Sequence, residues 1–309
     1  MLQCSVKINF EVLILKNGVI IINKEEGLTS QAVVNRVKRM LSADKAGHTG
    51  TLDPMATGVL PVLVNRGVKA SEFMLTSDKH YGATLLLGVT TDTEDVTGNI
   101  LTESHLIPDE KTVMAAIDSF VGDYMQTPPM YSALKVGGKK LYELAREGKE
   151  IEREARAVKI YSISAKKLSD REYYLDVKCS KGTYIRTLCA DIGARLGCGG
   201  TMKTLERCEA SGFTLNDGIT LSALEGLTVE ERWARVLPVE VIFKDKKEVT
   251  LPPFFARLAR AGQEIYLKKL RLALDIGETV RLTDSDGFFA LGEVREFEGG
   301  AAIKPIRQF

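Results

Sequence analysis

The chain has 309 residues, 44% of them apolar, so it can bury a sizeable core and form one large domain with a smaller second one. Its formal net charge is only +1, which argues against a uniformly basic nucleic-acid-binding protein. The charge is uneven, however. Basic residues outnumber acids in 135–159, 166–186 and 257–271, whereas 89–110 contains six acids and no Lys or Arg. Charge alone leaves each basic block open to two interpretations, a solvated face or part of a polyanion-binding surface.

The cysteine pattern bears on metal binding and redox state, and the N-terminal segment bears on the cellular compartment of the protein. The five cysteines form no C-x-x-C pair and their spacing does not suit a zinc site, so we expect reduced thiols and no metal. The first 22 residues contain apolar stretches, but Glu11 and Lys16 interrupt them and no cleavage pattern follows. We therefore expect neither a signal peptide nor a membrane span, and we predict a cytoplasmic protein.

Hydrophobic periodicity predicts helices and strands along the whole chain. In chain order, the predicted elements are a hairpin at Asn17-Gly18, a helix over 30–41 with Ser30 as its N-cap, strands over 58–64 and 81–88, a helix over 112–121 ending at Gly122, a helix over 139–148 closed by Gly148, strands over 158–168 and 172–180, and a helix over 183–197. In the last helix, Arg186 lies near the start and off the apolar face.

A domain boundary is expected between about 238 and 250, where prolines and a charged stretch fall close together. The remainder is β-rich, with a second hairpin at Asp286-Gly287. The pattern predicts an α/β (α+β) fold, in which a mixed, mainly antiparallel sheet is followed by a small C-terminal β-rich domain.

One stretch, GHTGTLDPMATGVL at 47–60, places a single carboxylate, Asp53, in a glycine- and threonine-rich loop directly before a buried strand. Asp before Pro is by itself a common turn. Here, however, glycines permit close backbone approach, and His48 and the threonines add polar groups. The chain has no phosphate-binding glycine motif and no histidine pair for a metal. A single carboxylate without metal or cofactor indicates a nucleophile or a base.

This stretch and three others resemble motifs of the TruB family of bacterial tRNA pseudouridine-55 synthases, in the family's order. The others are KHYGATLLLGVTTDTEDVTG at 79–98, TPPMYSALKVGGKKLYELAREG at 127–148 and KGTYIRTLCADIGARLGCG at 181–199. The segment after 248 resembles, more loosely, the family's PUA-type RNA-binding domain. The resemblance implies an N-terminal extension at 1–17, a catalytic domain at 18–245 with a thumb-like RNA-contacting insertion at 127–155, and a PUA-like domain at 246–309.

The resemblance also implies catalytic roles. Asp53 matches the catalytic aspartate, and Arg186 matches an arginine that approaches it. A guanidinium at that place would favour and orient the ionised carboxylate. Tyr81 matches a tyrosine that stacks on the flipped base and lies where a phenol can transfer a proton. Without the family, Tyr81 would be a core residue and Arg186 a surface residue.

Substrate-binding roles follow in the same way. His48 matches the residue that fills the gap left by the flipped nucleotide, Tyr184 matches a tyrosine near the target nucleotide, and Leu205 matches a pocket leucine. We expect further RNA contacts from basic residues in the thumb and near the start of the chain, namely Lys24, Lys135, Lys139, Lys140 and Arg146.

Two features need separate comment. Where the family usually has Asp-Lys-Pro-x-Gly, this chain has NKEEG, so Asn23 and Glu25 replace the Asp and the Pro. The acidic loop at Asp92, Glu94 and Asp95 fails the EF-hand spacing for calcium, and we expect it to be a solvent loop that steers RNA away.

Together these residues imply isomerisation of uridine to pseudouridine at position 55 in the T loop of tRNA, by base flipping and an aspartate-dependent rearrangement of the glycosidic bond. No cofactor is expected, because the reaction has no redox step. The expected partner is the T arm of tRNA, bound by a monomeric, protein-only enzyme with no guide RNA and no membrane. Two alternatives stay open, a catalytically silent tRNA-binding or tRNA-folding protein and a base-excising glycosylase.

Overall fold

The structure, a computed structural model, describes residues 17–309. The expected extension therefore lies outside the described residues except for Asn17, as does the first arm of the expected hairpin at Asn17-Gly18. The first described strand, β1 (Gly18–Lys24), pairs antiparallel with β3 (Thr57–Val64) along its whole length.

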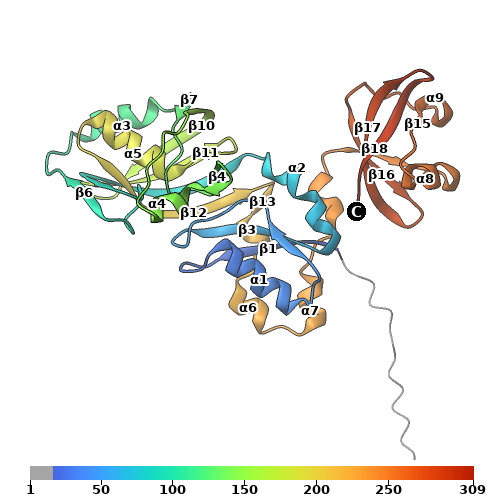
Figure 1. Cartoon of the computed structure of the whole chain (residues 1–309), viewed down its shortest axis with the longest axis horizontal. Coiled ribbons are helices and arrows are strands. Elements are labelled where there is room, and N and C mark those ends of the chain that lie inside the picture. Colours follow the sequence, from blue (N-terminus) through green and yellow to red (C-terminus); the bar gives the residue numbers. More distant parts are fainter. Residues whose placement is uncertain (1–16) are drawn as a thin grey trace, which may run out of the picture.

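The larger sheet has nine strands, with the main order β1-β3-β12-β4-β11-β10-β7 (Figure 1). All of its pairs are antiparallel except the short β3–β12 pair, which confirms the predicted mixed, mainly antiparallel sheet. Its other strands are β2 (Ala46–His48), β4 (Lys79–Leu87), β7 (Gly122–Gln126), β10 (Arg156–Lys167), β11 (Glu172–Cys179), β12 (Gly200–Ala210) and β13 (Phe213–Thr214).

The main core lies between one face of this sheet and four helices, α1 (Ser30–Met40), α3 (Glu110–Asp118), α5 (Ile185–Leu196) and α6 (Leu221–Glu225). Alternate residues of the strands, such as Ala83 and Leu85 of β4, point into it. Burial of each large apolar side chain contributes roughly 1.5–3 kcal/mol, so this core fixes α5 and its first turn against the sheet.

The C-terminal residues form a second, five-stranded sheet, ordered β14-β16-β17-β18-β15, which confirms the predicted β-rich domain. Its strands are β14 (Lys247–Thr250), β15 (Ile265–Tyr266), β16 (Thr279–Asp284), β17 (Gly287–Phe297) and β18 (Gly300–Gln308), and it lies to the right in Figure 1. The antiparallel β16–β17 pair confirms the second hairpin, with its turn at Ser285-Asp286, one residue before the predicted Asp286-Gly287. Rings of Phe288 and Phe309 pack on Phe243, at centroid distances of 6.0 and 5.5 Å, and connect this sheet to the larger domain.

Several predicted helix boundaries were wrong, and the helix predicted from 139 begins at Leu141, because Lys139 and Lys140 form β9. Thr29, not Ser30, caps α1, because its hydroxyl accepts a hydrogen bond from the amide of Ala32. Helix α3 begins earlier than predicted, after the cap residue Asp109, and ends at Asp118, so that Gly122 opens β7 instead of closing the helix.

The remaining helices and strands are short. They are α2 (Ser71–Leu75), α4 (Leu141–Arg146), α7 (Val229–Ala234), α8 (Pro253–Arg260), α9 (Leu267–Leu270), β5 (Val89–Thr91), β6 (Ile100–Glu103), β8 (Lys135–Val136) and β9 (Lys139–Lys140), with 3-10 turns η1 (Asn65–Ala70), η2 (Leu215–Asp217) and η3 (Val239–Phe243). None of the helices within residues 17–309 is long and apolar enough to span a membrane.

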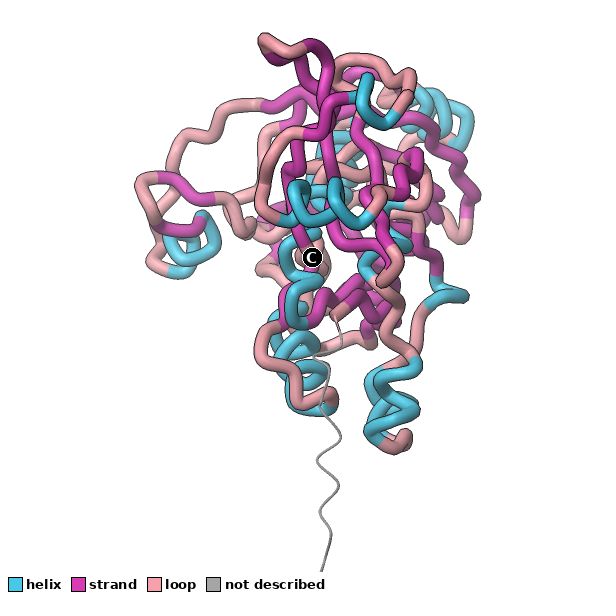
Figure 2. Tube along the Cα trace, turned by 90° about the vertical axis from the view of Figure 1, so that its right-hand side faces the viewer, coloured by secondary structure: helices cyan, strands magenta, loops and turns pink. Residues whose placement is uncertain are grey.

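The segment 127–155 leaves the sheet after β7 and returns to it in β10. Its base is closed by the antiparallel pairing of Gln126 with Arg156. In between, β8 and β9, strands of two residues each, form a hairpin that is followed by α4. The side view shows this small unit standing away from the main body (Figure 2).

Candidate active site

The loop that carries Asp53 is held from both sides of the carboxylate. The buried Ser30 hydroxyl accepts from the amide of Leu52 at 2.8 Å and donates to its carbonyl at 3.0 Å. After the carboxylate, Gly58 has a φ of +102°, and a Cβ there would lie 2.4 Å from the carbonyl oxygen of Arg207. The glycine therefore permits β3 to lie directly against β12, which fixes the end of the Asp53 loop.

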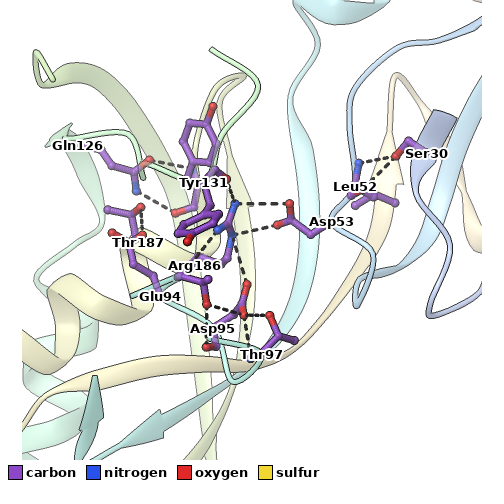
Figure 3. A network of polar contacts seen from close by, with 12 residues as sticks. Ser30, Leu52, Asp53, Glu94, Asp95, Thr97, Gln126, Tyr131, Arg186 and Thr187 are labelled. Carbon is purple, nitrogen blue, oxygen red and sulfur yellow. Dashed lines mark hydrogen bonds and ion pairs between the residues drawn. The ribbon is translucent and has the colours of Figure 1, made fainter. Parts of the chain in front are cut away.

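Arg186 meets Asp53 across the site (Figure 3). Its Nε lies 2.9 Å from Oδ2 of Asp53, and one terminal nitrogen lies 3.4 Å from Oδ1. The other guanidinium contacts are the carbonyl of Thr93 at 2.9 Å and the carbonyl of Tyr131 at 2.8 Å. The Arg186 side chain is only 5% exposed, whereas that of Asp53 is 33% exposed, so the carboxylate lies at the mouth of the site and the guanidinium behind it.

The acidic loop belongs to this site, and the prediction of a solvent loop was wrong. Asp95 is buried, and its Oδ2 lies 3.9 Å from Nε of Arg186. Its other oxygen accepts from the amide and hydroxyl of Thr97. Glu94 accepts from the hydroxyl of Thr187, the residue after Arg186, at 2.5 Å. Two acids of the loop therefore hold the start of α5.

The electrostatics of Asp53 reflect two opposing effects. Burial raises the pKa of the Asp53 carboxyl above its ordinary value, and the nearby Asp95 acts in the same direction. The charge and hydrogen bonds of Arg186 and the charge of Lys24 oppose this rise. Asp53 is thus a carboxylate whose ionised form depends on the cations around it.

Lys24 is buried and bonds to the backbone of the Asp53 loop. It does not lie on the surface, where an RNA contact was predicted for it. The residue is 1% exposed, and its ammonium donates to the carbonyls of Glu25, Pro54 and Ala56. Burial lowers the pKa of Lys24 to about 8. We correct the expected RNA contact on this ground, because the ammonium is used to hold the backbone next to Asp53.

Tyr81 and Leu205 lie on neighbouring strands, β4 and β12, and each is less than 10% exposed. In the register of these strands Tyr81 pairs with Arg207, which is buried and donates to the carbonyls of Val59 and Gly50. Burial raises the pKa of the Tyr81 phenol, and Arg207 opposes that effect. Sequence reasoning missed Arg207, which follows Leu205 at strand spacing and so lies on the same face of β12.

His48 and Tyr184 lie on separate elements, β2 and the residue before α5. His48 ends β2, and its Nδ1 accepts from the amide of Gly50 at 3.3 Å. Burial and the charge of Arg207 lower the pKa of His48, which keeps the ring neutral. Tyr184 immediately precedes α5, and burial raises the pKa of its phenol, while the charge of Arg186 opposes the rise.

The expected RNA-contacting residues of 127–155 lie on the β8–β9 hairpin and on α4. Lys135, Lys139 and Arg146 are exposed, and Lys140 is half-buried against Tyr142. Nζ of Lys139 lies 3.4 Å from Oε1 of Glu147, and an exposed ion pair of this kind contributes little to stability. The four cations are thus available to an external polyanion. No group of three His, Cys, Asp or Glu side chains within residues 17–309 is arranged to hold a metal ion.

Comparison with known proteins places most of the chain in one family. Residues 38–185 match the N-terminal domain of the TruB family pseudouridylate synthases, and residues 186–244 match the tRNA pseudouridylate synthase B C-terminal domain. The chain is 42% identical over 295 residues to the tRNA pseudouridine synthase B of Francisella philomiragia and 41% identical over 292 residues to that of Francisella tularensis subsp. novicida, with 93% of each chain covered.

Among solved structures, a chain of an H/ACA ribonucleoprotein bound to a substrate RNA containing 2′-deoxyuridine is similar in fold. Its TM-score is 0.69 at 23% identity, over 94% of this chain and 84% of that one. The fold, the paired Asp53 and Arg186, and the two full-length relatives lead to one conclusion: the chain belongs to the TruB family of pseudouridine synthases.

Proposed function

We propose that the protein isomerises uridine 55 in the T loop of tRNA to pseudouridine, with Asp53 as the catalytic group. The observation that carries this proposal is the ion pair of Asp53 with the buried Arg186, in which the carboxylate is the partner open to the outside. Pseudouridine formation in tRNA is the activity of the family to which the chain belongs.

The chemistry follows from the reacting bonds. The C1′–N1 bond must break, the base must turn while it stays bound, and a C1′–C5 bond must form. An ionised carboxylate serves this reaction by attacking C1′ or C6 or by removing a proton from the sugar. The Arg186 guanidinium favours the ionised form against the effect of burial, so it acts on the same step.

The target nucleotide must leave its stack before Asp53 can reach it. We propose that Tyr81 stacks on the flipped base and that Leu205 and Tyr184 contact it, because these residues lie on the strands and the helix start that surround Asp53. His48 is proposed to fill the gap left in the RNA. A neutral ring, such as the lowered pKa of His48 provides, is suited to stacking in that gap.

The remaining surface is assigned to the T arm. Lys135, Lys139, Lys140 and Arg146 are proposed to contact RNA phosphates, and residues 246–309 to form a PUA-like RNA-binding domain. We propose a monomeric cytoplasmic enzyme that needs no guide RNA, because the basic hairpin and α4 of 127–155 provide a protein surface for the substrate.

Asp53→Asn tests the proposal, because it keeps the size and hydrogen bonding of the side chain but removes its charge. Single-turnover kinetics on a T-arm hairpin at saturating enzyme should show no pseudouridine formation, whereas RNA affinity should change little. Product at more than a small fraction of the wild-type level would mean that Asp53 is not the catalytic group. Wild-type protein that binds tRNA but forms no pseudouridine would identify a silent tRNA-binding protein.

A further inference from the structure

Gln126 is a buried polar residue that the proposed chemistry leaves without a role. It is the last residue of β7, directly before the segment 127–155, and it is 1% exposed. A buried amide must have partners for both its oxygen and its nitrogen, and an unmade bond there is costly. The partners of Gln126 are therefore informative.

Both the oxygen and the nitrogen of the side-chain amide form hydrogen bonds with the backbone of one residue, Tyr184. Oε1 of Gln126 accepts from the amide of Tyr184 at 2.7 Å, and Nε2 donates to its carbonyl at 2.9 Å. Nε2 also lies 3.4 Å from the hydroxyl of Tyr124, which itself donates to Asp191. The pattern requires one donor and one acceptor in fixed positions, which a glutamine side chain supplies.

Tyr184 precedes the first turn of α5, and no side chain of its own caps that helix. Arg186 lies two residues further and must meet Asp53 at 2.9 Å. The same guanidinium donates to the carbonyl of Tyr131, so the base of the segment 127–155 is connected to the start of α5 at two points, by Gln126 and by Arg186. The position of the guanidinium therefore depends on how Tyr184 is held.

We infer that Gln126 is a positioning residue for pseudouridine formation, which holds Tyr184 and the first turn of α5 so that Arg186 meets Asp53. The inference rests on the proposed roles of Asp53 and Arg186. A misplacement of about 1 Å at a reacting group costs about 100-fold in rate, so loss of this clamp should lower the maximal rate by about 10- to 100-fold. RNA affinity should change by less than about threefold, because Gln126 is 1% exposed and so offers RNA no surface of its own.

The test compares two substitutions that differ in their hydrogen bonding. Gln126→Met keeps the length of the side chain and removes both bonds. Gln126→Glu introduces a carboxyl that, when protonated, offers one donor and one acceptor as the amide does, but when ionised offers only acceptors. An ionised carboxyl would face the carbonyl of Tyr184 without a proton between them. The effect of Gln126→Glu should therefore depend on pH, and that of Gln126→Met should not.

The groups around Gln126 determine where that dependence falls. Tyr124 and Tyr184 face the amide directly, Asp191 and Glu94 lie behind Tyr124, and Arg156 is the paired residue on β10. Burial and the two acids favour the protonated form of an introduced carboxyl. Two cations oppose this, Arg156, which is exposed, and Arg186, whose charge is offset by Asp53 and Asp95. The carboxyl should therefore titrate above the ordinary value for glutamate, within the range in which the enzyme can be assayed.

Single-turnover rates on a T-arm hairpin at saturating enzyme are measured from about pH 5 to 8.5, each divided by the wild-type rate at the same pH. This ratio removes the titration of Asp53. For Gln126→Glu the ratio should approach one at low pH and fall by about 10- to 100-fold as pH rises. For Gln126→Met it should be low throughout. Gln31→Glu, the same change at an exposed residue on α1, should give a ratio near one at every pH.

A ratio for Gln126→Glu that does not change with pH, or rates for both variants within about threefold of wild type, would overturn the inference. A rate loss that parallels the unfolded fraction measured by circular dichroism would also overturn it. If Gln126→Met does not fold, the pH series of Gln126→Glu decides by itself. Activity retained by Asp53→Asn would instead refute the proposed chemistry, so the two failures are distinguishable.

Discussion

Replacement of Arg186 by lysine should separate charge from geometry in the active site. The guanidinium holds Asp53, the carbonyl of Thr93 and the carbonyl of Tyr131 at once, at 2.8–3.4 Å, and lysine has one ammonium at the end of a flexible chain. Loss of one charge-assisted hydrogen bond to Asp53 costs about 1.5–3 kcal/mol, or about 10- to 150-fold in rate. Arg186→Lys should therefore lower the maximal single-turnover rate by that amount, with RNA affinity within about threefold of wild type.

The matched control for this substitution lies on the same helix. Arg195→Lys changes an exposed arginine near the end of α5, which bonds to the hydroxyl of Ser119, and should leave the rate unchanged. The assay is pseudouridine formation on a T-arm hairpin at saturating enzyme, with affinity measured separately by filter binding. A rate for Arg186→Lys within about threefold of wild type would show that a positive charge alone is sufficient and that the planar fork is not required.

Three further predictions concern titration, the buried lysine and the C-terminal domain. Because burial raises the pKa of Asp53, the wild-type rate should fall with decreasing pH through an apparent pKa above the ordinary aspartate value, and an acid limb at or below that value would contradict the reasoning. Lys24 is protonated below about pH 8, and its ammonium donates to three carbonyls. The rate should therefore also fall as pH rises through about 8. Lys24→Met should remove this fall at high pH and lower the rate at every pH. Replacement of the exposed Arg257, Lys269 and Arg271 by glutamine should weaken tRNA binding and reduce the slope of log affinity against log salt by about 2, and an unchanged slope would show that this block is only a solvated face.

Most of the fold and the Asp53 loop were predictable because their signals are local. The strand that carries Tyr81 is an apolar run, and glycines around Asp53 mark the loop. The strand that carries Leu205, β12, is rich in polar residues and was not predicted. The position of Arg186 at the start of its helix was also predicted, whereas its burial was not evident from the pattern. Side chains in a helix point toward its N-terminus, and at this end the guanidinium contacts the carboxylate of Asp53 and the carbonyls of Thr93 and Tyr131.

The residues that were misread have partners far away in the chain. Asp95 belongs to an acid-rich segment that is typical of a solvent loop, and only the approach of Arg186, far along the sequence, explains its burial. The burial of Lys24, in contrast, could have been predicted from the sequence. Ile20 and Ile22 point into the core, and strand alternation places Lys24 on the same face. A lysine at an inward position predicts carbonyl partners, which the structure provides at Pro54 and Ala56.

In the proposed reaction the charge of Asp53 changes, and the other contacts of Arg186 explain how this buried cation would remain in place. If Asp53 were its only partner, loss of the carboxylate charge during the chemistry would leave an uncompensated guanidinium, which is strongly unfavourable in a buried site. Here the carbonyls of Thr93 and Tyr131 take two of its bonds and the buried Asp95 supplies a second negative charge at 3.9 Å. The cation is thus fixed by groups that do not react. Of the three charged groups Asp53, Asp95 and Arg186, Asp53 is the only one that is partly exposed, and the guanidinium that it meets is already held by its other partners.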